Sequence, residues 1–387
     1  MQFELTETQQ TLRNTVRKFL AAECPMAEVR RLMETGTAFD PVLWQKIADQ
    51  GWTGMLIPEQ YGGFGMGMVD MAAALEEMGR ALLPGPFFST VLMAGPLIER
   101  AGNENQKQKY LGAIARGEAK VTVAFLEDPP SWSPDGVQMS ARSAGGGYLL
   151  DGKKLFVPDA AVADFLVVIA RLEGKLALFV VASNSKGLSI SPMSSMDLTR
   201  KVYEVALDSV KIASEDVLAT GAAAAAALGP ARAIATAGLV AEMTGGMQRL
   251  LEITVEYAKT RKQFGRPIGQ FQAVQHQCAD MLLYTESSRS GAYYAAYALQ
   301  EAIPEAQLAV SVAKAYASDA YRETGNRAIQ VHGGMGFTWE NDAHLYYRRS
   351  KVSEQMFGDA AFHREQIAKM VVDAHPARPE EKAAGRG

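Results

Sequence analysis

The chain has 387 residues, of which 48% are apolar, so it is long enough for two or three domains with a large core. Its formal net charge is −4 and it carries no basic block, which argues against nucleic-acid binding. Its two cysteines, Cys24 and Cys278, are far apart and lack metal-ligand spacing, so we expect neither a disulfide framework nor a metal site.

Residues 1 to about 120 have helical patterns. Thr6 stands where it would cap a first helix, and Asp40-Pro41 is typical of a further helix start. A glycine-rich break at 58–67 precedes helical spacing over 68–83. We therefore predict an N-terminal α domain over residues 1–120, with no signal-peptide pattern at its start.

The periodicity changes at about residue 121. Short β-prone runs occur at 121–125, 147–157, 165–170 and 176–181, separated by Gly, Asp, Pro and Ser turns. These runs predict a middle antiparallel β domain over residues 121–221.

Helix-forming sequence returns at Ala222 and continues to about residue 373, with glycine- or proline-marked breaks. We predict a C-terminal bundle of the four-helix type over 222–374 and a disordered tail over 375–387. The expected fold class is α+β with three domains. No apolar run reaches about 18 residues, so we expect no membrane span and a cytoplasmic protein.

Three separated motifs resemble those of the acyl-CoA dehydrogenase family, in the family's order and spacing. They lie at residues 58–63, 257–265 and 330–337. The resemblance covers nearly the whole chain. It implies the acyl-CoA dehydrogenase fold and FAD-dependent α,β-dehydrogenation of an acyl-CoA in lipid metabolism, with electrons passed to an electron-transfer flavoprotein.

The resemblance also implies a set of cofactor contacts. Arg261 would bind the FAD pyrophosphate, since a guanidinium suits a phosphate. Gln330, Gly333 and Gly334 would meet FAD from a neighbouring subunit, because glycines allow a close backbone approach. Other assigned positions are Phe264, Gln272, Phe156 and Asp359. A solvated helix charge, a packing turn and a core phenylalanine are the structural alternatives for Arg261, the glycines and Phe264.

The flavin-facing strand departs from the family. Phe156-Val157-Pro158 stands where the family has Trp-Ile-Thr. A phenylalanine can still stack on a flavin, but proline donates no hydrogen bond. The contact near the flavin N5 atom is therefore expected to differ.

The usual catalytic base is missing. Most family members carry a Glu where this chain has Phe357, and a minority carry it at the position of Ala235. Phenylalanine and alanine accept no proton. Asp359 and Glu242 are the nearby candidates; each has a structural alternative, a helix N-cap for Asp359 and a salt bridge for Glu242.

The substrate contacts also depart from the family pattern. The family's Asp-x-x-Arg is absent, since the matching stretch is 233–236. Arg232, about one turn away, is assigned to the CoA phosphate instead, and Gly358 to the substrate.

Three functions remain open. The first is a working dehydrogenase with a relocated base. The second is a catalytically poor subunit of a heteromeric dehydrogenase, in which another acyl-CoA dehydrogenase chain carries the base. The third is a flavin monooxygenase on the same scaffold. The resemblance implies a tetramer, built from identical chains or from two kinds of chain.

Overall fold

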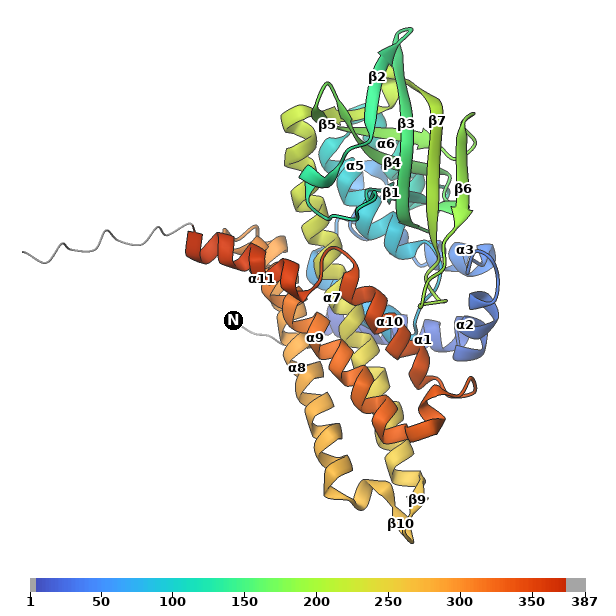
Figure 1. Ribbon diagram of the computed structural model, residues 1–387, viewed down its shortest axis with the longest axis vertical. Coiled ribbons are helices and arrows are strands. Elements are labelled where there is room, and N and C mark those ends of the chain that lie inside the picture. Colours follow the sequence, from blue (N-terminus) through green and yellow to red (C-terminus); the bar gives the residue numbers. More distant parts are fainter. Residues whose placement is uncertain (1–4, 374–387) are drawn as a thin grey trace, which may run out of the picture.

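The computed structural model describes residues 5–373, so the predicted tail at 375–387 lies outside it. Helical, β and helical regions follow one another along the chain, and the β region forms one end of an elongated molecule (Figure 1). This architecture confirms the expected fold class.

The N-terminal region is helical up to residue 115. The side chain of Thr6 caps the first helix in a capping box, and Asp40 caps the third, which has proline at its first position. A π-helical segment, Phe88–Ala94, leads into the fifth helix. The helices are α1 Glu7–Glu23, α2 Met26–Met33, α3 Pro41–Asp49, α4 Met68–Arg80, α5 Gly95–Ala101 and α6 Glu104–Ala115.

The β region starts at Val121 and ends at Thr220. Its strands are β1 Val121–Ala124, β2 Ser140–Ala144, β3 Gly147–Pro158, β4 Phe165–Leu172, β5 Lys175–Ala182, β6 Leu188–Pro192, β7 Val202–Ala213 and β8 Val217–Thr220. They form one sheet in the order β6-β7-β3-β2-β4-β5-β8, with β1 beside β4. Most pairs are antiparallel, but β4 runs parallel to both β1 and β2, which the expected all-antiparallel pattern did not include.

The C-terminal region packs long helices side by side. They are α7 Gly221–Thr260, α8 Gln272–Gln300, α9 Ala306–His332, α10 Ala343–Gln355 and α11 Ala360–Ala368. A short hairpin of β9 Lys262–Gln263 and β10 Arg266–Pro267 joins α7 to α8 at the end of the bundle opposite the sheet (Figure 1).

Helix α7 is the central element of the molecule. Its length and composition alone would suit a membrane span, yet 61% of its most apolar window is buried against the other helices, as in a core helix. It crosses α4 very closely: a Cβ atom on Gly245 would lie 1.7 Å from the carbonyl oxygen of Glu76, so only glycine fits there. This close crossing also fixes the preceding turn of α7, which carries Glu242.

Candidate active site and cofactor site

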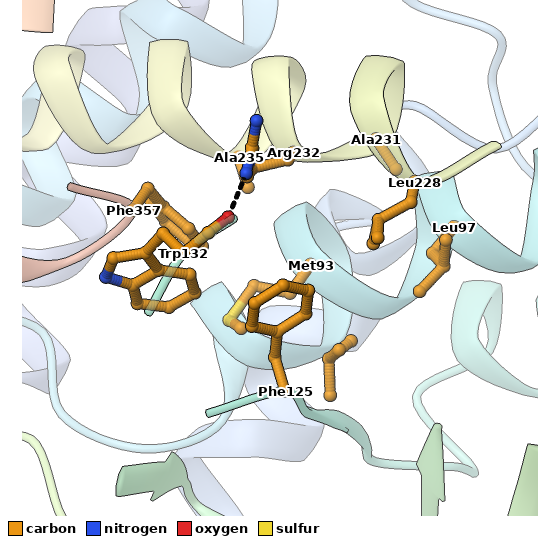
Figure 2. A pocket seen from close by; sticks show the side chains of 10 residues that line it. Met93, Leu97, Phe125, Trp132, Leu228, Ala231, Arg232, Ala235 and Phe357 are labelled. Atoms are coloured by element: carbon orange, nitrogen blue, oxygen red, sulfur yellow. Dashed lines mark hydrogen bonds between the residues drawn. The ribbon is translucent and has the colours of Figure 1, made fainter. Parts of the chain in front are cut away.

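A mostly apolar cavity of about 370 Å³, partly open to solvent, lies between α7, the segment that includes the π-helix and α5, and β1 (Figure 2). The loops after β1 and after α10 complete its walls. The lining residues are Met93, Leu97, Val123, Phe125, Trp132, Leu228, Ala231, Arg232, Ala235 and Phe357. No carboxylate is among them.

Both positions that the resemblance assigns to a base lie on this cavity wall. Ala235 comes from α7 and Phe357 from the turn after α10. The Phe357 side chain is 3% exposed, and its ring centroid lies 5.0 Å from that of Trp132 and 6.2 Å from that of Phe88. Its φ of +60° is a strained conformation for a bulky residue. The wall at the expected base positions is therefore apolar.

Buried Lys314 of α9 holds the turn that carries Phe357. Its Nζ donates hydrogen bonds to the carbonyl oxygens of Glu354 at 2.9 Å and Gly358 at 2.8 Å, and to Oγ of Ser318 at 2.8 Å. Burial lowers the pKa of Lys314 to about 7. Gly358, which was assigned to the substrate, thus has its carbonyl oxygen bound by this lysine. Sequence reasoning missed Lys314, because a lone lysine in a helix gives no signal of burial.

Asp359 is the N-cap of α11. Its Oδ1 accepts the backbone N–H of Phe362 at 2.8 Å. The helix N-cap, which was the structural alternative to a catalytic role for Asp359, is therefore present. The cap orients this carboxylate toward the helix terminus.

Glu242 is buried in a set of ion pairs. Its Oε1 and Oε2 accept hydrogen bonds from Nη2 of Arg200 at 2.8 and 2.7 Å, and Oε1 also pairs with Nη1 of Arg349. Glu242 is 6% exposed and does not line the cavity. The salt-bridge alternative is therefore also present.

The same ion pairs extend into the β region. Arg349 of α10 binds Asp197 and Thr199, which lie between β6 and β7. Although burial acts to lower it, the carboxylates of Asp197 and Glu242 hold the pKa of Arg349 above its usual range. We call Asp197, Arg200, Glu242 and Arg349 the buried charge cluster. Arg349 is 152 residues from Asp197 and 107 from Glu242 in the sequence, so no local pattern could reveal these pairs.

Asp159, just after β3, lies beside this cluster. Its Oδ2 accepts a hydrogen bond from Oγ of Ser89 at 2.6 Å. Burial raises the pKa of Asp159 to about 6, even though Arg200 and Arg349 act in the opposite direction. Asp159 as a residue is 3% exposed, and its carboxyl group forms no ion pair with any described residue.

Arg232 of α7 reaches the cavity rather than the outer surface. Its Nη1 donates to the carbonyl oxygen of Trp132 (Figure 2). The Trp132 indole N–H in turn donates to the carbonyl oxygen of Gln355 at 2.9 Å. These bonds hold the loop after β1 against the cavity.

Most of the assigned cofactor residues gather at the far end of the bundle. Arg261 follows the last turn of α7, and the hydroxyl of Tyr257 donates to the carbonyl oxygen of His332 at 3.4 Å, which joins this end to the glycine segment. Gln330, Gly333, Gly334 and Gln272 are exposed there. Phe264 is 90% exposed, so it is not a core residue of this chain.

Phe156 lies elsewhere, on β3. The β3–β7 register shifts between Lys154 and Val157, and this bulge leaves Phe156 44% exposed with φ of +53°. Its backbone N–H donates to Sδ of Met193 at 3.3 Å. The bulge therefore presents a flat aromatic side chain at the sheet surface.

The structure does not bring Phe156 together with Arg261. The buried charge cluster joins the sheet to α7 at Glu242, and Arg261 lies about 28 Å further along the helix at about 1.5 Å per residue. Figure 1 shows the hairpin and the sheet at opposite ends of the molecule. Within this chain the two groups of assigned residues therefore lie at different ends of the molecule.

Comparison with known proteins identifies the family. The models of the acyl-CoA dehydrogenase N-terminal and C-terminal domains match residues 6–118 and 221–372. A relative from Mycobacterium tuberculosis, acyl-CoA dehydrogenase IpdE2, is 31% identical over 351 residues, covering 90% of this chain and 93% of its own. The chain belongs to the acyl-CoA dehydrogenase family.

Solved structures agree with this acyl-CoA dehydrogenase fold. The ChsE4–ChsE5 complex from Mycobacterium tuberculosis superposes with a TM-score of 0.88 at 29% identity, covering 97% of this chain and 100% of that chain. The FAD complex of PigA superposes with a TM-score of 0.89 at 25% identity, covering 96% and 99%.

The chain is a flavoprotein of the oxidoreductase class, and FAD is its cofactor. The residues at the bundle end fit this group. Arg261 forms no ion pair with any residue in the described range, so its guanidinium is available to a phosphate. Gly333 has φ of +59°, and a Cβ on Gly333 or Gly334 would meet nothing within 4 Å, which leaves the backbone open to a ligand.

Proposed function

We propose that this chain is the base-deficient subunit of a heteromeric, FAD-dependent acyl-CoA dehydrogenase. The observation that carries the proposal is the cavity wall. Ten residues line the cavity, and none of them is a carboxylate. Phe357 fills the position where the family resemblance expects the base.

The absence of a carboxylate from the cavity wall matters because the reaction needs a base. Removal of the α proton of a thioester needs a base within hydrogen-bond reach, and such a base contributes about 10²–10⁴-fold to the rate. Asp359 caps α11, and Glu242 is bound by Arg200 and Arg349. Neither carboxylate stands free at the cavity, so another chain is needed to supply the base.

The cofactor residues support the same assembly. FAD supplies the hydride acceptor when it is bound. This chain would hold the pyrophosphate with Arg261 and approach it with Gly333 and Gly334, while the flavin faces the sheet of a second chain. One of the structural neighbours is named as a complex of two differently named chains, ChsE4 and ChsE5. We therefore propose a heterotetramer with a second acyl-CoA dehydrogenase chain.

The remaining parts of the proposal follow the family. The substrate is an acyl-CoA, the electron acceptor is an electron-transfer flavoprotein, and the location is the cytoplasm in a route of lipid metabolism.

The test is co-expression with a second acyl-CoA dehydrogenase chain that carries a Glu at the usual base position. The two chains should co-purify as one assembly that contains FAD. An acyl-CoA should then bleach its flavin, and a Glu→Gln change in the second chain should abolish bleaching.

The competing function, a self-sufficient dehydrogenase, predicts a different result. The homomeric chain would bleach on its own, and Glu242→Gln or Asp359→Asn would then abolish the reaction. A chain that never joins a second acyl-CoA dehydrogenase chain would overturn the heteromeric proposal.

A further inference from the structure

Arg232 is the one charged residue among those that line the cavity. It comes from α7 together with Leu228, Ala231 and Ala235, and Figure 2 shows these four along one side of the cavity. The facing side is formed by aliphatic and aromatic groups. A guanidinium therefore stands in a wall that is otherwise apolar.

The guanidinium is only partly satisfied by the protein. Within residues 5–373 its hydrogen bond is the one from Nη1 to the carbonyl oxygen of Trp132, and it forms no ion pair. Its Cζ also lies 5.9 Å from the ring centroid of Phe362. Arginine has five N–H donors in a planar fork, so most of its capacity remains for another partner.

Its surroundings are apolar and positively charged. Burial lowers the pKa of Arg232. Nearby His363 is buried, and burial, with the charges of Lys314 and Arg232, lowers its pKa to about 3, so this imidazole stays neutral. The carboxylate of Asp359 acts to raise the pKa of His363, but this carboxylate is already engaged as the cap of α11. The Arg232 side chain is half-buried and has no anionic partner among the described residues, so a bound anion would offset part of its desolvation cost.

We propose that this cavity binds a ligand with an apolar carbon skeleton that ends in a carboxylate, held by Arg232. A carboxylate matches the guanidinium fork and can accept two hydrogen bonds from it. The apolar skeleton would contact Met93, Leu97 and Phe125. Apart from Arg232 the cavity is walled by apolar groups, which suits such a skeleton better than the several phosphates of CoA.

The carboxylate has two possible sources, a free acid or the far end of a dicarboxylic acyl-CoA. The proposal concerns the specificity of the same cavity, and it does not require that the chain turn over its ligand. Binding and flavin bleaching are separate measurements, so failure of one proposal is distinguishable from failure of the other.

The experiment measures binding to the flavin-loaded full chain by calorimetry. The probes are octanoate, its uncharged partner octanamide, CoA alone, and the CoA thioester of octanedioic acid. Octanoate should bind at least tenfold more tightly than octanamide. Charge-assisted hydrogen bonds of about 1.5–3 kcal/mol correspond to about 10–100-fold in affinity. A preference for the octanedioyl thioester over the octanoyl thioester would assign the carboxylate to an acyl-CoA, and equal affinity would assign it to a free acid.

Two variants test whether the Arg232 guanidinium causes the preference for octanoate over octanamide. Arg232→Met removes the charge, and Arg232→Gln also removes it but keeps a donor for the carbonyl group of Trp132. Both should bind octanoate and octanamide equally. Arg364→Met is the matched control, because Arg364 is 60% exposed on α11 and pairs with Asp319 away from the cavity.

Several results would overturn the proposal. They are equal binding of octanoate and octanamide by the unaltered chain, binding of neither, or octanoate binding that persists in Arg232→Gln. Arg232-dependent binding of CoA alone would assign the guanidinium to a phosphate instead.

Discussion

At the scale of single residues, Asp159 is a carboxyl group whose surroundings favour its neutral form. It lies at the end of β3, accepts a hydrogen bond from Ser89, and is nearly inaccessible to solvent. Its folded pKa of about 6 is above the ordinary value of 3.8. The proton is thus held more tightly by the folded than by the unfolded chain.

We predict that Asp159→Asn stabilises the protein near neutral pH. The stabilising contribution of the protonated carboxyl is complete below about pH 3.8 and is lost as the pH rises through about 6. At pH 7.5 the variant should gain about 2–3 kcal/mol, since one pKa unit corresponds to about 1.4 kcal/mol. At pH 4.5 the gain should fall to about 1 kcal/mol, because the carboxyl is then protonated in the folded chain but already mostly ionised in the unfolded chain. Thermal unfolding at both pH values measures this difference.

The exposed Asp135 supplies the control for this prediction. Asp135→Asn should shift the unfolding temperature little and equally at the two pH values. An Asp159→Asn variant that is destabilised equally at both would show that the carboxylate is stabilising in the folded chain.

At the scale of elements, the buried charge cluster connects α7, α10 and the segment between β6 and β7. A buried ion pair contributes little net free energy, but removing one partner leaves an uncompensated buried charge. We therefore expect Glu242→Gln to lower the free energy of unfolding by about 3–5 kcal/mol.

Glu256→Gln is the matched control for this variant. Glu256 lies on the same helix and pairs with Lys259, but that pair is exposed, so its loss should cost less than about 1 kcal/mol. Denaturant unfolding of both variants is the measurement. A Glu242→Gln variant as stable as the control would mean that the cluster does not fasten these elements together.

The elements also show which features could be predicted from sequence. The caps Thr6 and Asp40 and the breaks between the long helices were predicted because their signals are local. Strand β7 was missed, although Tyr203, Val205 and Leu207 alternate with less buried residues along it. That period-2 pattern was a usable signal.

Some features of the site could also be predicted from sequence, and others could not. Family motifs located Phe357 and Ala235, and the structure places both on the cavity wall. The ion pairs of Glu242 and the buried contacts of Lys314 depend on tertiary packing between distant segments. No window of sequence contains both partners of such contacts.

At the scale of the whole molecule, the assigned cofactor residues are divided between the sheet and the far end of the bundle. We predict that Arg261→Gln weakens FAD binding by about 10–100-fold, because charge-assisted hydrogen bonds to a phosphate are worth about 1.5–3 kcal/mol. The fold should be unaffected, because Arg261 is exposed. Flavin content after dilution, with the unfolding temperature of the flavin-free chain, measures both effects.

Arg249→Gln is the control for the Arg261 variant, since Arg249 also lies on α7 and is paired with Glu252. It should keep the normal flavin content. Equal flavin content in Arg261→Gln and the unaltered assembly would contradict the assignment of this residue to the pyrophosphate.

The central claim is that this chain does not supply the catalytic base. The most direct measurement is the visible flavin spectrum of the purified, FAD-loaded chain alone, mixed without oxygen with acyl-CoAs of varied length, branching and terminal charge. The cavity wall of Phe357 and Ala235 predicts that the oxidised flavin spectrum persists with every one of them. Bleaching by any of these acyl-CoAs, at a rate lost on Glu242→Gln or Asp359→Asn, would contradict the claim and show that the base lies in this chain.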